Sequence, residues 1–301
     1  MTQIEFVAVD WGTSSFRAWA IGADGAVCAC HKGAQGMNTL TSDQFSSVLE
    51  QALVQMEVPA HVPVVASGMV GAAQGWIEAP YVPIDGALEQ LHLRAVKAPG
   101  TAREVFILPG VKQTTPPNVM RGEETQIAGF LQSHAEFTGV LCLPGTHAKW
   151  VEVSGGRIQH FVSAMTGEIF GLISDQSILR HSMGADGWDQ ASFETAVVGA
   201  LATPESVATE LFEIRAGTLL TSANAAKARA RLSGLLLGFE FAATRTMWSG
   251  QTVHLIGAAD LTCTYAQALS LADATTDCHD ATALTLAGLS ASAKHLLKEP
   301  A

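Results

Sequence analysis

The chain has 301 residues, of which 48% are apolar and 15% are charged, and its formal net charge is −11. This length is enough for about two domains, each with its own core. A net acidic chain argues against nucleic acid as a partner, because a phosphate backbone requires a basic surface. The five cysteines are scattered without a CxxC pair, and the histidines show no metal-ligand spacing. We therefore expect neither a disulfide framework nor a zinc site.

The sequence contains neither a signal-peptide core nor a run of 18 apolar residues. These absences predict a cytoplasmic protein without a membrane partner.

Residues 7–21, VAVDWGTSSFRAWAI, predict two strands joined by a polar turn, because β-branched residues alternate before the turn and apolar residues follow it. The first half is then expected to contain a strand at 26–31, a helix at 42–56, strands at 62–66 and 104–108, and a helix at 123–133. Residues 76–100 and 111–120 are expected to be irregular.

A second strand–turn–strand arrangement is expected at 140–153, followed by a strand at 158–163. Beyond it we expect a mostly helical stretch at 167–247, a strand at 253–256, and helices at 261–271 and 281–297. The arrangement thus occurs twice, which predicts two similar halves. Glycine-rich turns that face each other would form a ligand-binding cleft between these halves.

The first turn has a composition suited to phosphate and metal binding. Asp10 ends the strand, and Gly12, Thr13 and Ser14 follow. Glycine lets backbone N–H groups approach an anion, and hydroxyl groups donate to phosphate oxygens. A carboxylate can hold Mg²⁺ directly or through water. The same residues also fit an ordinary hairpin with a polar tip.

Five segments in order resemble the phosphate, connecting and adenosine motifs of the sugar kinase, heat-shock-70 and actin superfamily. They are 7–21, 64–71 (VVASGMVG), 140–153 (VLCLPGTHAKWVEV), 253–261 (VHLIGAADL) and 284–292 (LTLAGLSAS). The resemblance implies an α/β fold of two ribonuclease-H-like domains, each a mixed β-sheet flanked by helices, around an interdomain cleft. Residues 1–133 would bind the sugar and carry the first phosphate motif. Residues 134–301 would bind the nucleotide, with the last helix able to pack back on the first domain.

The segments DWGTSSFRAW, ASGMVG, MRGEETQIAG, LPGTHAKWV and MTGEIF resemble the 2-dehydro-3-deoxygalactonokinase family. This resemblance implies Mg²⁺-dependent transfer of the ATP γ-phosphate to the 6-hydroxyl of 2-dehydro-3-deoxy-D-galactonate, a step of galactonate breakdown. Three alternatives remain: a kinase of another sugar or sugar acid such as 2-dehydro-3-deoxygluconate, an exopolyphosphatase-like phosphohydrolase, and a non-catalytic nucleotide-binding regulator. The stereochemistry at C4 and a homodimeric state stay open.

The phosphate-binding residues follow from the two turns. Asp10 is the expected Mg²⁺ ligand, and the β- and γ-phosphates would be cradled by Gly12, Thr13 and Ser14. Arg17 either neutralises phosphate charge or is a solvated strand residue. On the nucleotide side we expect contacts from Gly145, Thr146, Gly257 and Ala258. The adenosine motif often has a second glycine where Ala258 stands, so loose recognition of adenine is expected.

A sugar hydroxyl needs a carboxylate to accept its proton. Adjacent helical residues point about 100° apart, so only one of two neighbouring glutamates can face the cleft. We expect Glu124 to be the base, with Glu123 as the second choice and Asp85 as the third. Both glutamates could instead simply favour the positive end of the helix dipole.

The remaining candidates concern the sugar acid. Arg121 is expected to bind its carboxylate, because a planar guanidinium binds a carboxylate through two hydrogen bonds. Lys149 could hold a phosphate or the carboxylate, or could be a surface lysine. The expected pocket is lined by Ser67, Gly68 and Met69, with His147 nearby. A contact to nucleotide or sugar, or only a helix cap, is expected from Thr166, Gly167 and Glu168.

Overall fold

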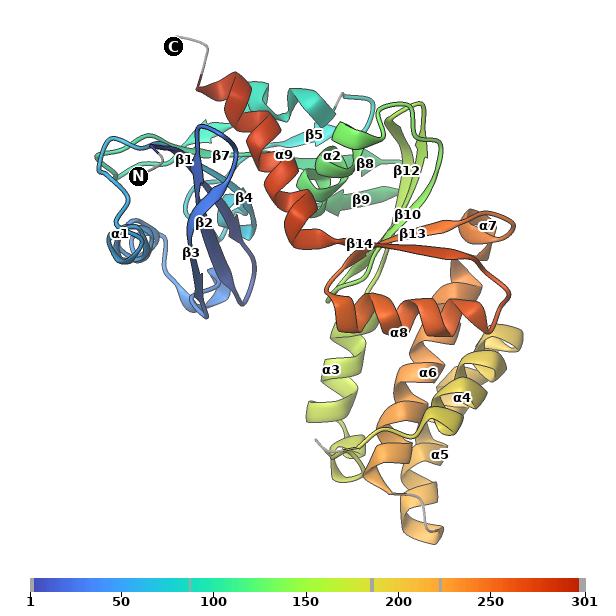
Figure 1. Ribbon diagram of the computed structural model, residues 1–301. Helices are drawn as coiled ribbons and strands as arrows, with labels where there is room; N and C mark the ends of the chain where they lie inside the picture. The colour runs from blue at the N-terminus through green and yellow to red at the C-terminus, as the bar shows by residue number, and fades with distance from the viewer. Residues whose placement is uncertain (1–2, 87, 185–186, 222–223, 298–301) are drawn as a thin grey trace. The chain divides into compact units, whose positions relative to one another are not determined.

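The computed structural model describes residues 3–86, 88–184, 187–221 and 224–297. Its backbone forms two compact units, and Figure 1 labels most of their helices and strands. Unit 1 takes the described residues of Met1–Phe137, Ser154–His160 and Ala281–Ala301, and unit 2 takes those of Thr138–Val153 and Phe161–Asp280. The chain therefore leaves unit 1 and returns to it twice, first at a hairpin tip and again in its last helix. The functions expected for residues 1–133 and 134–301 stay predictions.

Unit 1 is built on a six-stranded mixed sheet with the order β3-β2-β1-β4-β7-β6. The first three strands along the chain are antiparallel neighbours, whereas β4 lies parallel to both β1 and β7. The bounds are β1 (Ile4–Trp11), β2 (Phe16–Gly22), β3 (Val27–Gly33), β4 (Val64–Gly68), β6 (Val96–Lys97) and β7 (Val105–Ile107).

Both faces of this sheet are covered by helices, as the alternation of side chains along β1 requires. Val7 and Val9 share a core with α1 (Phe45–Gln55), whereas Phe6 and Ala8 share a core with α9 (Ala281–Leu296). α9 also packs against α2 (Glu123–Ser133), so residues 121–125, with the sequence RGEET, belong to unit 1. Three short 3₁₀-helices complete the helices of unit 1: η1 (Met37–Thr39), η2 (Met69–Gly71) and η3 (Leu88–Arg94).

A second, three-stranded sheet of unit 1 has the order β5-β8-β9, with bounds β5 (Tyr81–Pro83), β8 (Gly110–Thr114) and β9 (Pro117–Met120). The prediction that 111–120 is irregular was therefore wrong, and 76–100 includes β5, β6 and η3. The strand β8 was hidden because Gln113 occupies one of its inward positions. Its side-chain amide donates to the Pro116 carbonyl at 2.9 Å, so the buried polar group is satisfied without an apolar pattern.

Unit 2 contains a five-stranded sheet with the order β12-β11-β10-β13-β14. Its strands are β10 (Gly139–Leu143), β11 (Ala148–Ser154), β12 (Arg157–Ala164), β13 (Val253–Gly257) and β14 (Thr276–Asp280). The edge strand β14 was not predicted, because its sequence TDCHD is short and polar. Its parallel pairing with β13 makes it a strand all the same.

The helices of unit 2 pack on this sheet and on one another. They are α3 (Thr166–Gln176), α4 (Gln190–Ala202), α5 (Val207–Leu220), α6 (Ala225–Ala243), α7 (Arg245–Trp248) and α8 (Ala259–Ser270), with η4 (Ile178–His181) and η5 (Pro204–Ser206). One core joins the sheet to α4, α6 and α8, and another joins α4, α5 and α6.

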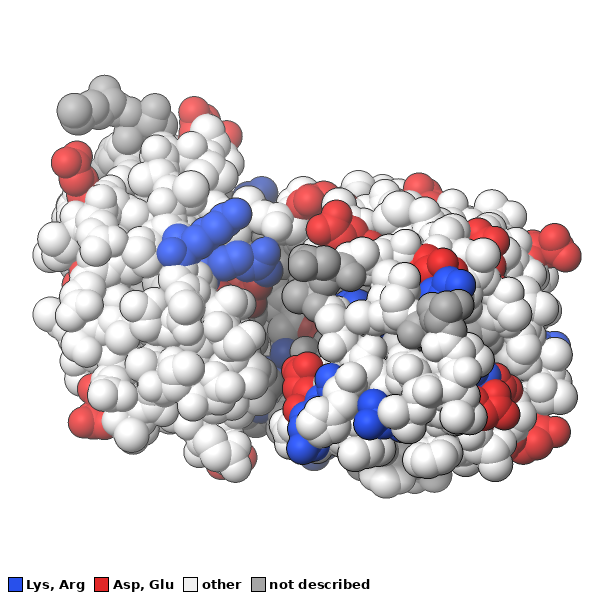
Figure 2. Space-filling view, turned by 90° about the horizontal axis from the view of Figure 1, so that it is seen from below, with Lys and Arg blue, Asp and Glu red and all other residues white. Residues whose placement is uncertain are grey.

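The two large sheets repeat one topology. Three antiparallel strands are followed by two parallel ones in β3-β2-β1-β4-β7 and again in β12-β11-β10-β13-β14. The predicted α/β class, with two mixed sheets flanked by helices, is confirmed. Each described helix is too short or too polar to cross a membrane. On the face drawn in Figure 2, most of the surface is neither acidic nor basic, as expected when 15% of the residues are charged.

Candidate functional site

Asp10 lies near the end of β1, opposite Arg17 on β2. The Arg17 guanidinium donates to the Asp10 carboxylate from one nitrogen and to Thr282 Oγ1 at 3.2 Å from another. Arg17 is thus not a solvated strand residue; it compensates the charge of Asp10 and ties β2 to the start of α9. The turn between the two strands is exposed at Thr13 and Ser14, where hydroxyl groups are accessible to a ligand.

The end of β4 lies directly beside Asp10. Ser67 is the parallel partner of Asp10, and Gly68 is the partner of Trp11. Gly68 has φ +96°, and a Cβ there would lie 2.6 Å from the Trp11 carbonyl oxygen, so only glycine fits. The Ser67 hydroxyl is buried and has no hydrogen-bond partner among the described residues. A buried orphan hydroxyl next to a strand-end carboxylate is available to a polar ligand. Met69, half-buried, follows at the start of η2.

The start of α2 lies against this same strand end. Gly122 has φ +107°, and a Cβ built on it would come 3.5 Å from Gly68 Cα. Glu124 is 1% exposed, and both its carboxylate oxygens accept the Gly122 N–H at 2.7–2.8 Å. Burial, and next the charge of Glu123, raise the pKa of Glu124 to about 7. Glu123 is only half-buried and accepts the Arg121 N–H at 3.1 Å. The two neighbouring glutamates therefore have different environments.

Arg121 is buried, with one guanidinium nitrogen unused. Its Nη2 donates to the Ala79 carbonyl at 2.8 Å, its Nε donates to the Tyr81 hydroxyl at 3.3 Å, and its guanidinium lies 4.2 Å from the centre of the Tyr81 ring. Nη1 is buried and has no partner among the described residues. An anion could take this place. Sequence reasoning missed Tyr81, which no pattern singled out. Asp85 is exposed just beyond β5.

In unit 2 the second turn packs on the start of α3. A Cβ at Gly167 would lie 2.5 Å from the Gly145 carbonyl oxygen, and the Glu168 N–H donates to the Thr146 carbonyl at 2.9 Å. The Glu168 carboxylate also contacts His147 Nε2. The three residues 166–168 therefore support the turn and begin the helix. The N-cap of α3 is Met165 and no side chain caps it, so the expected capping role was wrong.

This turn borders a cavity of about 240 Å³ within unit 2. The lining residues come from α3, α6, α8, the turn and the segment before α4, and are Gly145, Thr166, Gly167, Phe170, Trp188, Arg229, Ser233, Leu236, Leu237, Leu261, Thr264 and Tyr265. The lining of the cavity is mostly apolar and includes two glycines, Gly145 and Gly167, which suits a planar base with an attached phosphate chain. Sequence reasoning found its glycine turn and missed its helical wall.

The adenosine segment lies next to the second turn. A Cβ at Gly257 would lie 3.7 Å from Pro144, the residue before Gly145. Ala258 has φ −69° and ψ 142°, an extended conformation that any L-residue adopts. The backbone at this position therefore accepts alanine in place of the second glycine.

A buried carboxylate, Glu240, organises the wall of this cavity. It accepts Trp150 Nε1–H at 2.8 Å and the Tyr265 hydroxyl at 3.0 Å, and it also accepts the Thr166 hydroxyl. Burial raises the pKa of Glu240. The network joins β11, α3, α6 and α8, and it holds two of the lining side chains in place. Sequence reasoning missed Glu240, because a glutamate within an apolar helix carries no recognisable motif.

Lys149 is 6% exposed, so the alternative that it is a surface lysine was wrong. Its ammonium donates to Ser163 Oγ at 2.7 Å within the sheet of unit 2. Unit 1 thus places Asp10 beside Ser67 and the start of α2 beside Gly68, and in unit 2 the second turn borders the cavity. The roles of all these residues in binding or catalysis stay predictions.

Two units of one mixed-sheet topology, each with a polar or glycine-rich turn after its first strand, form the architecture of the actin-like ATPase fold class. The same fold occurs in the activator of 2-hydroxyisocaproyl-CoA dehydratase from Clostridium difficile, solved with bound ADPNP (TM-score 0.51, 13% identity, 98% of each chain covered). At this identity the likeness concerns the fold alone.

The profile of the family described as 2-keto-3-deoxy-galactonokinase matches residues 10–292. A protein of Rhizobium meliloti (strain 1021) described as a probable 2-dehydro-3-deoxygalactonokinase is 41% identical over 295 residues, 96% of each chain. The 2-dehydro-3-deoxygalactonokinase of Escherichia coli (strain K12) is 30% identical over 266 residues, 87% of this chain and 88% of that one. A candidate 2-dehydro-3-deoxygalactonokinase from Sinorhizobium meliloti has a crystal structure with TM-score 0.91 and 40% identity, covering 98% of this chain and 100% of its own. The chain belongs to the 2-keto-3-deoxy-galactonokinase family, a family of carbohydrate kinases.

Proposed function

We propose that the protein transfers the γ-phosphate of ATP to the 6-hydroxyl of 2-dehydro-3-deoxy-D-galactonate, giving ADP and 2-dehydro-3-deoxy-6-phospho-D-galactonate in galactonate catabolism. Family membership and the two named relatives support the reaction. The observation that carries it in this chain is the buried Glu124 carboxylate, whose pKa is raised to about 7 at a helix start that lies against the end of β4, the strand paired with β1 next to Asp10. A base with a pKa close to the working pH is what proton removal from a hydroxyl needs.

In the proposed step, Glu124 accepts the proton of the 6-hydroxyl. The hydroxyl oxygen forms a bond to the γ-phosphorus while the bond from that phosphorus to the β–γ bridging oxygen breaks, and ADP leaves with the electron pair. The half-buried Glu123 faces a different environment and hydrogen-bonds the Arg121 backbone, which makes it the weaker candidate. The Gly122 N–H fixes the Glu124 carboxylate, so its orientation is set before a substrate arrives.

The residues around Asp10 fit a magnesium ion. The carboxylate supplies the hard oxygen ligand that Mg²⁺ prefers, and the adjacent turn is rich in hydroxyl groups. We propose that Asp10 holds Mg²⁺, which when bound supplies positive charge to phosphate oxygens. Arg17 keeps the carboxylate oriented, and the backbone of Gly12 with the hydroxyl groups of Thr13 and Ser14 would donate to phosphate.

The sugar acid needs a cation in an acidic protein, and Arg121 is the proposed one. Its unused Nη1 group is buried, so a carboxylate bound there would lie in a medium of low dielectric constant. The attraction between the two charges would therefore be stronger than on the surface. Lys149 is the second choice. The buried Ser67 hydroxyl and the backbone of Gly68 would bind sugar hydroxyl groups beside the base. His147, in the second turn, is a further proposed substrate-binding residue.

The nucleotide is proposed to bind unit 2, with its base in the cavity and its phosphates at Gly145 and Thr146. Gly257, whose Cβ position lies 3.7 Å from Pro144, and the following Ala258 are further proposed nucleotide contacts. This proposal follows the expectation that residues 1–133 bind the sugar and residues 134–301 bind the nucleotide. The location in the cytoplasm is part of the proposal, and light scattering would measure whether the protein forms a homodimer.

A substrate panel with direct detection of ADP tests the reaction. Pure 2-keto-3-deoxy sugar acids that differ at C4 are incubated with ATP and Mg²⁺, and ADP is quantified by chromatography, because a lactate dehydrogenase coupling could reduce the keto acids. We expect the galactonate derivative to give the highest kcat/KM. A preference for the gluconate epimer would reassign the substrate, and phosphate release without any acceptor would indicate a phosphohydrolase.

A further inference from the structure

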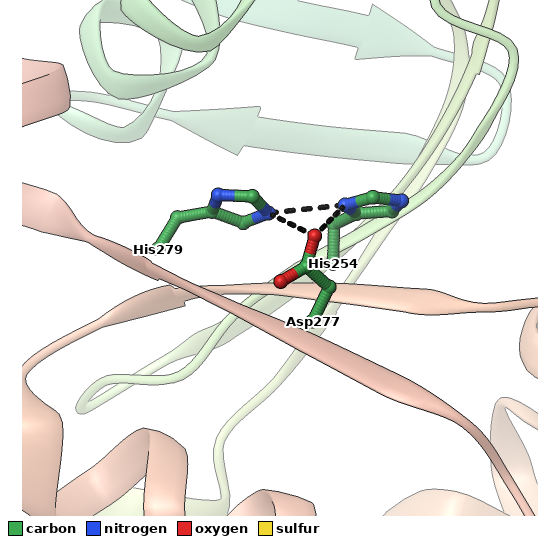
Figure 3. A group of neighbouring side chains, drawn as sticks. All are labelled: His254, Asp277 and His279. Carbon is green, nitrogen blue, oxygen red and sulfur yellow. Dashed lines mark hydrogen bonds and ion pairs between the residues drawn. The ribbon is translucent and has the colours of Figure 1, made fainter.

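Two strands of unit 2 bring His254, Asp277 and His279 together on one face of the sheet (Figure 3). His254 on β13 is the parallel partner of Asp277 on β14, and His279 lies two residues further along β14. Alternate residues of a strand point to the same face, so all three side chains lie on the face opposite Leu255, which packs in the core with α8. The cluster is thus built by strand register and does not involve the candidate catalytic residues.

The three ligand atoms have the spacing of a metal site. His254 Nδ1 and His279 Nε2 are 3.0 Å apart, and Asp277 Oδ2 lies 3.6 Å from the first and 3.5 Å from the second. A tetrahedral ion with ligands at about 2.0–2.1 Å has ligand–ligand edges of about 3.3–3.4 Å. The observed triangle matches that edge length to within a few tenths of an ångström. Figure 3 shows both ring nitrogens directed at the same carboxylate oxygen.

We propose that His254, Asp277 and His279 bind one first-row transition-metal ion of the zinc type. Two imidazoles and one carboxylate are the ligand set that suits Zn²⁺, whereas Mg²⁺ prefers an all-oxygen shell. Three protein ligands leave a fourth position for water. The histidine side chains are each 19% exposed and Asp277 is 58% exposed, so the ion can enter from solvent on the aspartate side.

The competing interpretation is a histidine pair that shares one proton. A 3.0 Å contact between two imidazole nitrogens fits a hydrogen bond when one nitrogen carries a proton and the other offers its lone pair. Asp277 decides between the two interpretations. At 3.5–3.6 Å its oxygen is too far for a good hydrogen bond to either ring, yet it completes the triangle at a distance suited to a shared ion. The proton of the pair is the one that the metal ion would displace.

The bound ion would link the edge strand β14 to β13. β14 is short and polar, and it leads straight into α9, which belongs to unit 1. β13 ends at Gly257, beside the second turn. An ion that joins the two strands would stabilise this edge by binding the folded state only. The expected effect is structural and is independent of the Mg²⁺-dependent transfer proposed above.

The test uses the full chain without a histidine tag, freed of metal by chelation. Titration with ZnCl₂ in a calorimeter measures stoichiometry and affinity, and CoCl₂ gives a visible absorption band whose intensity distinguishes tetrahedral from octahedral coordination. We expect one Zn²⁺ per chain, an intense tetrahedral Co²⁺ band, and a higher melting temperature with Zn²⁺ that Mg²⁺ at the same concentration does not reproduce.

Three ligand variants and one control locate the site. His254→Ala, His279→Ala and Asp277→Asn should each weaken Zn²⁺ binding at least roughly tenfold. Cys278→Ser is the matched control, since Cys278 lies between two of the ligands on the opposite side of β14. It should bind Zn²⁺ like the wild type. Loss of binding in the control, full binding in Asp277→Asn, or no 1:1 binding by the wild type would overturn the proposal. The wild-type measurements stand even if an alanine variant fails to fold.

Discussion

Glu124→Gln offers the sharpest test of the candidate active site. Glutamine keeps the shape of the side chain and an oxygen that can accept the Gly122 N–H, but it cannot accept a proton from the substrate. A positioned base contributes roughly 10²–10⁴ in rate, so we expect kcat to fall by at least a hundredfold. Glu123→Gln is the matched control, because it removes the neighbouring charge and leaves the buried carboxylate in place.

The pKa of Glu124 is raised to about 7, so the same variant should also change the pH dependence of kcat/KM. In the free wild-type protein about 91% of the base is ionised at pH 8 and about 9% at pH 6, so kcat/KM should fall about tenfold from pH 8 to pH 6. The small remaining activity of Glu124→Gln should lack that dependence. Glu123→Gln should retain the fall below neutral pH and move it to lower pH, since the charge of Glu123 is one cause of the raised pKa.

The free energy of unfolding should also depend on the protonation of Glu124. The direction is opposite to that of a salt-bridged carboxylate, whose contribution to stability rises with pH. A pKa raised above the ordinary value of 4.5 means that the folded state binds the proton more tightly, so this group's contribution falls as pH rises from about 4.5 to about 7. The difference between the two pKa values corresponds to about 3 kcal/mol as an upper limit. Glu124→Gln should therefore unfold at higher denaturant than the wild type at pH 8.

The assay is chromatographic ADP release at saturating ATP and Mg²⁺ from pH 5.5 to 8.5, with urea unfolding at each pH. Turnover of Glu124→Gln within tenfold of the wild type, together with loss of turnover in Glu123→Gln, would refute the assignment of the base. A wild-type kcat/KM that is flat between pH 6 and pH 8 would refute the reasoning from burial.

The other predictions concern the metal ligand, the carboxylate site and a helix contact. Asp10→Asn should lower turnover at least roughly a thousandfold with an unchanged melting curve, and near-normal turnover would exclude Asp10 as the Mg²⁺ ligand. Arg121→Ala should raise KM for the sugar acid more than Lys149→Ala does. If both variants keep the KM of the wild type, the carboxylate binds elsewhere. Gly129→Ala should lower unfolding free energy by about 1–3 kcal/mol, because its Cβ would lie 1.9 Å from the Leu284 carbonyl oxygen between α2 and α9. Unchanged urea unfolding would show that these helices adjust without cost.

The sequence by itself determined the repeated architecture and the main candidates of the first unit. Strand–polar turn–strand segments are local features, because strand propensity and turn residues act over a few positions. The pattern therefore revealed both meanders and placed Asp10 at a strand end. The order of five motifs also revealed the fold class. For the adjacent glutamates at a helix start, helical geometry shows only that the two side chains point in different directions. It does not show which of the two is buried.

Tertiary structure alone decided which side chains meet. Burial raises the pKa of Glu124 at a helix start that lies against Gly68, more than fifty residues away in the sequence. Burial also raises the pKa of Glu240, whose hydrogen-bond partners come from three other elements. β8 and β14 were missed because hydrogen bonding to neighbouring strands, and not hydropathy, makes them strands. The same pairing brings His254 to Asp277 across 23 positions of sequence, since parallel register sets contacts that no local spacing encodes.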